Sequence, residues 1–144
     1  MKTFTNLALS AMAALASLAI LPSASSAQST MAYPEKCKSQ GMDMSKADMS
    51  MNGMPTGEMT DYQKASMNGM KDMHMNMMQG MMKKDADVSF VCGMIAHHMG
   101  AISMSEVELE YGDNDEAKQM AKKVIEAQKK EIEEMSKWVD KEAK

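Results

Sequence analysis

Apolar residues recur at steps of three and four in three successive stretches between Thr60 and the end of the chain. This spacing places the apolar side chains on one side of an α-helix, which turns once every 3.6 residues. The connections between the stretches are short, as they are between antiparallel neighbours in helical bundles. The sequence therefore predicts an all-α fold, a small antiparallel helical bundle.

The first predicted helix begins at a Thr60 or Asp61 cap and extends to about Lys84. Its apolar stripe consists mainly of methionine and includes one histidine. The members of the stripe are Met67, Met70, Met73, His74, Met77, Met78 and Met81. Such a stripe more often forms a core than a ligand set, but Met75 and Met82 lie off it. Packing alone therefore does not explain the number of methionines.

The second predicted helix extends from about Asp87 to Glu110, with Asp85 or Asp87 as its cap and Tyr111-Gly112 at its end. It has two apolar faces. One face holds Val88, Val91, Cys92, Ile95, Met99, Ile102 and Leu109, and the other holds Phe90, Met94, His97, Ala101 and Met104. We expect this helix to be buried on both sides and to lie at the centre of the bundle.

The third predicted helix begins at an Asn114 or Asp115 cap and continues to about Lys141. Its inner stripe is Ala121, Val124, Ile125, Gln128, Ile132, Met135, Trp138 and Val139, and Glu131 lies beside it. Buried polar side chains need partners, and a histidine that binds a metal usually donates its other N–H to an oxygen. We therefore expect Gln128 or Glu131 to orient His97 or His98. A plain interhelical hydrogen bond or a solvated glutamate remains an equal alternative.

Residues 1–27 have the pattern of an export signal, with Lys2 near the start and an apolar run from Leu7 to Leu21. That run is about fifteen residues, shorter than a membrane-spanning helix requires. We expect cleavage after Ala27, a soluble periplasmic protein and no membrane span after cleavage. An uncleaved membrane anchor is the alternative.

Residues 28–59 lack a sustained period and are rich in Ser, Gly, Asp and Met, which predicts a flexible arm before a helical domain at residues 60–144. The arm carries short methionine spacings at Met42, Met44, Met49, Met51 and Met54. Such clusters can wrap one ion, or they are low-complexity sequence without a ligand.

Methionine is the most unusual part of the composition: 22 occur in 144 residues, and 20 remain once Met1 and Met12 leave with the expected signal. The thioether is a soft donor that selects Cu(I) over hard cations, and it carries no proton that binding would have to displace. The chain has no arginine, and its net charge is −4. Nucleic acid is therefore not an expected partner.

Candidate copper ligands cluster on the second helix. Met94, His97 and Met104 share one face, and His98 lies about 100° around the helix. Imidazole suits Cu(II) as well as Cu(I), so the mixture of donors suits both oxidation states. A lone buried histidine is usually a core residue, but two adjacent histidines flanked by methionine favour ligands. The full candidate set adds His74, Met70, Met73, Met77, Met78 and Met81 from the first helix.

The two cysteines, Cys37 and Cys92, are expected to form a disulfide in an oxidising compartment. Two thiolate copper ligands are the rival interpretation. Enzyme motifs are not found: Lys71, Met94 and Ile95, rather than glutamate, lie three residues before the histidines. The chain also has no zinc-protease helix motif and no phosphate-binding loop. We expect no catalytic turnover.

The stretch from Asp87 to Met104 has the core Met94-x-x-His97-His98-x-x-Ala101-Ile102-x-Met104. It resembles a widespread bacterial family, long labelled a domain of unknown function, that includes the CopM-type periplasmic copper metallochaperones. The resemblance extends from about Met67 to Val139. It implies an all-helical fold of the broad ferritin-like class and copper handling for export or detoxification. It also implies ligands at Met94, His97, His98 and Met104.

The expected function is an exported protein that sequesters or carries Cu(I), tolerates Cu(II) and accepts silver. A copper export or acceptor protein is its expected partner. Two other classes compete with this interpretation. A methionine-rich interaction module would bind peptides without metal, and an oxidant sink would cycle its methionines through the sulfoxide.

Overall fold

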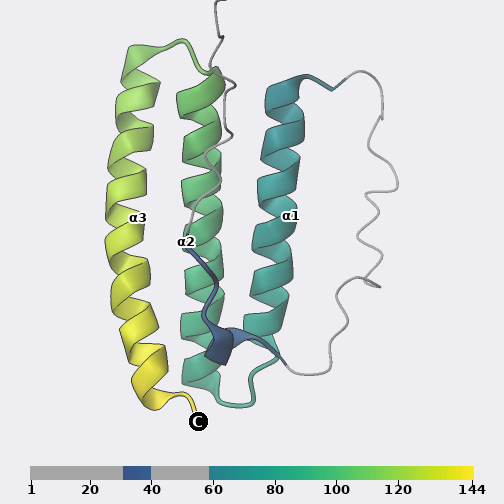
Figure 1. Cartoon of the computed structure of the whole chain (residues 1–144), viewed down its shortest axis with the longest axis vertical. Helices are drawn as coiled ribbons and strands as arrows, with labels where there is room; N and C mark the ends of the chain where they lie inside the picture. Colours follow the sequence, from purple (N-terminus) through teal and green to yellow (C-terminus); the bar gives the residue numbers. More distant parts are fainter. Residues whose placement is uncertain (1–30, 40–58) are drawn as a thin grey trace, which may run out of the picture.

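The computed structural model describes residues 31–39 and 59–144, which form one 3₁₀ helix and three α-helices (Figure 1). The 3₁₀ helix η1 spans Glu35–Cys37, and the α-helices are α1 (Asp61–Met81), α2 (Ala86–Tyr111) and α3 (Asp115–Glu142). The described part of the chain contains no strand, so the predicted all-α fold is confirmed. The expected signal and the arm methionines at positions 42 to 54 lie outside the described residues.

Each α-helix begins at a polar cap that the sequence marks. Thr60 and Gln63 form a reciprocal capping box at α1, and the Asp85 carboxylate accepts hydrogen bonds from two backbone N–H groups at the start of α2. Asn114 caps α3 in the same way. The predicted ends of α2 and α3 agree with the structure within one residue. The predicted end of α1 at about Lys84 is wrong, because the chain must leave the helix to place Asp85 in the extended conformation of a cap.

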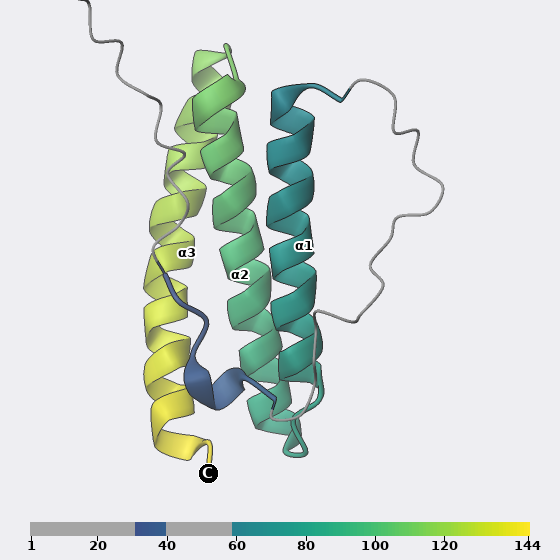
Figure 2. The same cartoon turned by 45° about the vertical axis from the view of Figure 1, so that its right-hand side comes forward.

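Helix α2 lies between α1 and α3 and packs against both (Figures 1 and 2). The contact with α1 is close because glycines lie along it. A Cβ atom on Gly80 would lie 2.8 Å from the backbone nitrogen of Gly93, and one on Gly69 would collide with the Ser103 hydroxyl. Glycine lowers helix propensity, yet here it lets two backbones approach.

The fully buried large side chains lie where α2, α3 and the N-terminal residues meet. They are Ile95, Ile102, Ile132, Val139, Cys37 and Cys92. The two cysteines form a disulfide with a Cα–Cα distance of 5.4 Å, which joins residues 55 apart in sequence. The core is therefore built on one side of α2.

Residues 31–39, here called the clasp, contact all three α-helices. The Tyr33 hydroxyl donates to the Cys92 carbonyl at 3.1 Å, and burial raises the pKa of Tyr33 to about 12. The Lys36 ammonium donates to two carbonyls at the C-terminal end of α3, which attracts positive charge. Ser39 donates to the Gln79 carbonyl of α1. The clasp thus holds one end of the bundle together.

The expectation that α2 is buried on both sides is wrong. Phe90 is 67% exposed and Met104 is 53% exposed, and His97 is also exposed. The reason is geometric: α1, α3 and the clasp cover three sides of α2, and no fourth described helix covers the remaining side. By length and composition α2 is apolar enough to cross a membrane, but a helix packed between two neighbours passes the same test.

Candidate metal centre

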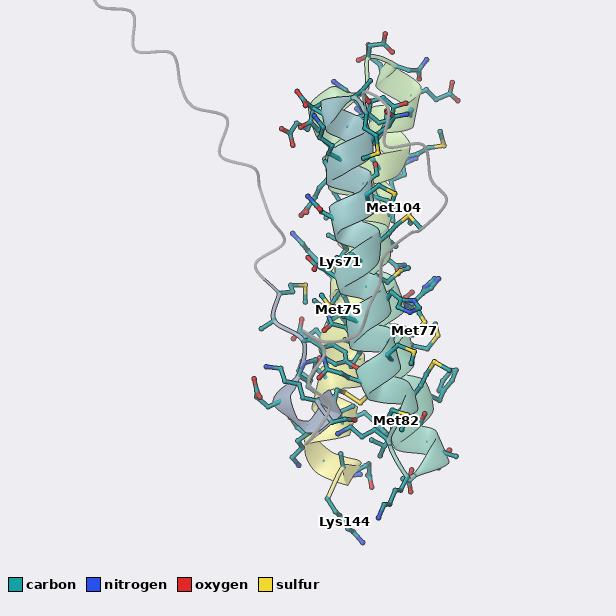
Figure 3. The ribbon with its side chains drawn as sticks, turned by 90° about the vertical axis from the view of Figure 1, so that its right-hand side faces the viewer. Lys71, Met75, Met77, Met82, Met104 and Lys144 are labelled. Carbon is teal, nitrogen blue, oxygen red and sulfur yellow. A yellow bond between two sulfur atoms is a disulfide. The ribbon has the colours of Figure 1, made fainter. Side chains whose placement is uncertain are left out.

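The uncovered side of α2 continues onto α1 and forms a surface rich in sulfur. Phe90 lies two residues before Cys92, about 200° around the helix, so this side faces away from the clasp. Figure 3 shows Met104, Met77 and Met82 along one edge of the α1–α2 pair, with Lys71 and Met75 on the other edge. We call this surface the open face. It comprises Phe90, Met94, His97 and Met104 of α2 with Met70, His74 and Met77 of α1.

The register of the two helices brings donors from α1 near donors from α2. Gly69 lies opposite Ser103, and Gly80 lies opposite Gly93, so the helices run antiparallel in a known alignment. Met70 is therefore within about one helical turn of Met104, and Met77 is within about one turn of His97. His74 follows Met70 by four residues and precedes Met77 by three, which places it on the same side of α1.

These donors differ in how far they are exposed. Met70 and Met104 are 45% and 53% exposed, and the imidazoles of His74 and His97 are also exposed. Met77 and Met94 are half-buried. The exposed donors of the open face can therefore receive an ion from solvent without rearrangement of the core, whereas Met77 packs against the core.

The structure separates other predicted ligands from this group. Met73 turns into the α1–α2 contact, where its side chain packs against Gly100. Met78 lies one residue beyond Met77 and so about 100° around α1. Met81 is not separated in this way: it follows Met77 by four residues on the same side of α1 and is 61% exposed at the end of the helix. Only part of the predicted methionine stripe shares a surface with the α2 donors.

His98 lies in different surroundings from its neighbour His97. Its side chain is buried, with 8% exposed, and its Nε2 lies 2.6 Å from Oε2 of Glu131 on α3. The two imidazole rings lie 6.0 Å apart between centroids, at an interplanar angle of 65°. Of the two polar residues expected to orient a histidine, Glu131 makes the contact, and Gln128 is half-buried about one turn before it in α3. The side chains of the two consecutive histidines thus lie in two different environments.

The donor set is soft. Among residues 31–39 and 59–144, no three His, Cys, Asp or Glu side chains gather closely enough to hold a metal ion. The two cysteines are joined to each other, so neither offers a thiolate. Thioethers and imidazoles are the donors on the open face, and this combination suits copper better than calcium or magnesium.

Sequence reasoning missed a cleft of about 490 Å³ between α1 and α2. Its lining includes Met75 and Met99 together with the acidic residues Asp72, Glu106 and Glu110. The position of Met75 off the methionine stripe was the one sequence signal for it. The acidic residues have the spacing of a solvent-exposed helix face, so their spacing did not predict a cleft.

The fold and the donors define an all-α domain with a methionine- and histidine-bearing surface. The chain belongs to the family described as a domain of unknown function, DUF305, which matches residues 10–139. No match was found among curated proteins.

Proposed function

We propose that this chain is an exported copper-binding protein that sequesters or carries Cu(I) and contributes to copper resistance and homeostasis. The observation that carries the proposal is the open face, where exposed thioethers from two helices lie on the same surface as the exposed imidazole of His97. Thioether sulfur favours Cu(I), and imidazole also accepts Cu(II). Silver, a soft monovalent ion, is expected to bind as Cu(I) does.

The exposure of these donors suits a carrier better than a permanent cofactor site. An ion held by Met70 and Met104, or by His97 together with Met77, remains accessible to an incoming ligand from another protein. Transfer to a copper export or acceptor protein would then proceed by exchange of one donor at a time. No general acid or base is required, in keeping with a protein that does not catalyse a reaction.

Two further features support this proposal. The resemblance of the segment around His97 and His98 to CopM-type metallochaperones matches ligand positions Met94, His97, His98 and Met104. The Cys37–Cys92 disulfide suits an oxidising compartment such as the periplasm, where the expected signal in residues 1–27 would direct the chain.

Titration of the purified protein with Cu(I) against a competing chelator tests the proposal. We expect binding tighter than micromolar, and its absence would reject a role in copper handling. Met104→Leu should weaken Cu(I) binding, because leucine retains the volume of methionine but has no sulfur. Met75→Leu on the opposite edge of α1 is the matched control and should leave the open-face affinity unchanged.

One observation favours a second candidate, a methionine-rich module that binds a partner helix or peptide. Phe90 is 67% exposed on the open face although it offers no donor to a metal. Flexible methionines adapt to many apolar partners. Peptide binding that is indifferent to copper and unaffected by His97→Ala would support this candidate over copper handling.

A further inference from the structure

The adjacent histidines of α2 offer two kinds of metal ligand. His97 is exposed on the open face, whereas His98 is 8% exposed and turns toward α3. The ring nitrogen Nδ1 of His98 is fully buried and has no hydrogen-bond partner among the described residues. Buried polar atoms in folded proteins nearly always have a partner. An unpaired buried nitrogen therefore points to a ligand.

Glu131 determines which nitrogen of His98 is free. Its carboxylate oxygen lies 2.6 Å from Nε2 and can only accept, so the hydrogen bond places a proton on Nε2. In the neutral imidazole the other nitrogen, Nδ1, then keeps its lone pair. A carboxylate on one ring nitrogen with a metal on the other is the usual arrangement of histidine ligands in proteins.

We propose that His98 is a ligand enclosed by the protein and selective for Cu(I) and Ag(I). It binds the ion through Nδ1 and is positioned by Glu131. His97 is the solvent-exposed ligand, which also accepts Cu(II). This inference rests on the proposed function and assigns different oxidation states to its two histidines.

The selectivity follows from enclosure and from the neighbouring donor. Cu(II) prefers a square of nitrogen and oxygen ligands, and it commonly keeps water among them. Nδ1 of His98 has no contact with solvent, so an ion bound there has no room to keep coordinated water. The half-buried thioether of Met94 lies one turn before His98, within reach of an ion bound there. Cu(I) and Ag(I) accept such a small set of soft donors.

Glu131 acts through His98 and is therefore a positioning residue. Its side chain is 51% exposed, so its replacement leaves the core intact. Glu131→Ala should weaken Ag(I) binding at His98 by about 10- to 100-fold, the usual effect of losing such a partner. Glu131→Gln should restore part of the affinity, because its amide oxygen can accept the same hydrogen bond. Glu134→Ala removes an equal charge from an exposed position of α3 and is the matched control.

Nitrogen NMR of the histidine side chains tests the assignment directly, since the chain has only three histidines. In the metal-free protein, we expect His98 to carry its proton on Nε2. Addition of Ag(I) should shift Nδ1 of His98 and leave its Nε2 protonated, and Glu131→Ala should abolish the single-tautomer signal. The measurements with and without Ag(I) use the unchanged protein, so none of the tests depends on whether a His98 variant folds.

Cu(II) provides the second half of the test. His97→Ala should reduce Cu(II) affinity at least tenfold, while Glu131→Ala leaves it unchanged. If Ag(I) binds but shifts the Nε2 resonance of His98, or shifts neither nitrogen of His98, this inference is overturned. The proposed function then remains intact. Equal loss of Cu(II) affinity in both variants also overturns it. If neither metal binds, the proposed function fails, and this inference fails with it.

Discussion

Helix α2 has a different kind of neighbour on each of its two sides. Toward α3 and the clasp it buries Ile95 and Ile102 completely, against Ile132 and Val139 of α3. Toward α1 the contact depends on glycine, and Gly80 is the only buried residue that α1 contributes. The first side has the properties of a core, whereas the second side leaves methionines accessible. The fully buried core thus lies toward α3, whereas the most exposed thioethers and His97 lie on the open face beside α1.

This division has a physical reason. Thioethers packed in a core contact apolar neighbours, and these contacts must break before the sulfur atoms can bind an ion. At the glycine-lined contact Met73 packs against Gly100, whereas Met70 remains at the surface, because the close approach of the backbones leaves little space for further large side chains. The disulfide joins the clasp to α2, and the Lys36 hydrogen bonds join the clasp to α3, so the half of the molecule that holds the core is also cross-linked.

Truncation of one side chain on each side of α2 should give the largest difference between an effect on stability and an effect on copper binding. Ile102→Ala removes a fully buried side chain and should lower the free energy of unfolding by about 2–5 kcal/mol. Met104→Ala, at an exposed position, should change it by no more than about 0.5 kcal/mol while weakening Cu(I) binding. Urea denaturation and Cu(I) competition measure the two effects. A large loss of stability in Met104→Ala would mean that the open face is covered in solution.

Reduction of the disulfide should destabilise the half that it joins. The pair Cys37→Ser and Cys92→Ser should lower the free energy of unfolding by about 2–4 kcal/mol, because the bond closes a long loop. Copper affinity at the open face should remain, since neither cysteine lies on it. The intact and chemically reduced wild-type proteins provide the control. If the double cysteine variant no longer binds copper, the interpretation of the cysteines as thiolate copper ligands is favoured instead.

The smallest expected effect tests the glycine contact itself. Gly80→Ala places a methyl group 2.8 Å from a backbone nitrogen of α2, so the helices must separate, at a cost of about 1–3 kcal/mol. Gly93→Ala is its matched control, because nothing lies within 4 Å of the new atom. The control should be neutral or should stabilise α2 by about 0.5–1 kcal/mol. Thermal unfolding of both variants measures the difference, and equal destabilisation would contradict the close approach.

Much of the fold could be predicted from short-range sequence patterns. The caps at Thr60, Asp85 and Asn114 are local, since each side chain bonds to backbone two or three residues ahead. Apolar spacing located α2 and α3 within one residue. The end of α1 was missed because the turn into the Asp85 cap depends on the path between two helices.

The candidate site could be predicted only in part. The identities of the soft donors are visible in the sequence, and either Gln128 or Glu131 was expected beside a histidine. Which of the two meets His98 depends on how far α3 is rotated and shifted against α2. Periodicity specifies a face of one helix but not the register between two helices.

The sequence by itself determined the helices, their caps and the supply of sulfur and imidazole donors, because these depend on neighbouring residues and on side-chain chemistry. Only the tertiary structure decided that His98 is buried while His97 is exposed, and that no other residue in 31–39 or 59–144 covers one apolar side of α2. Both results come from the number and placement of the packing neighbours. Two neighbouring helices and a clasp cover only part of a helix that is apolar on two faces.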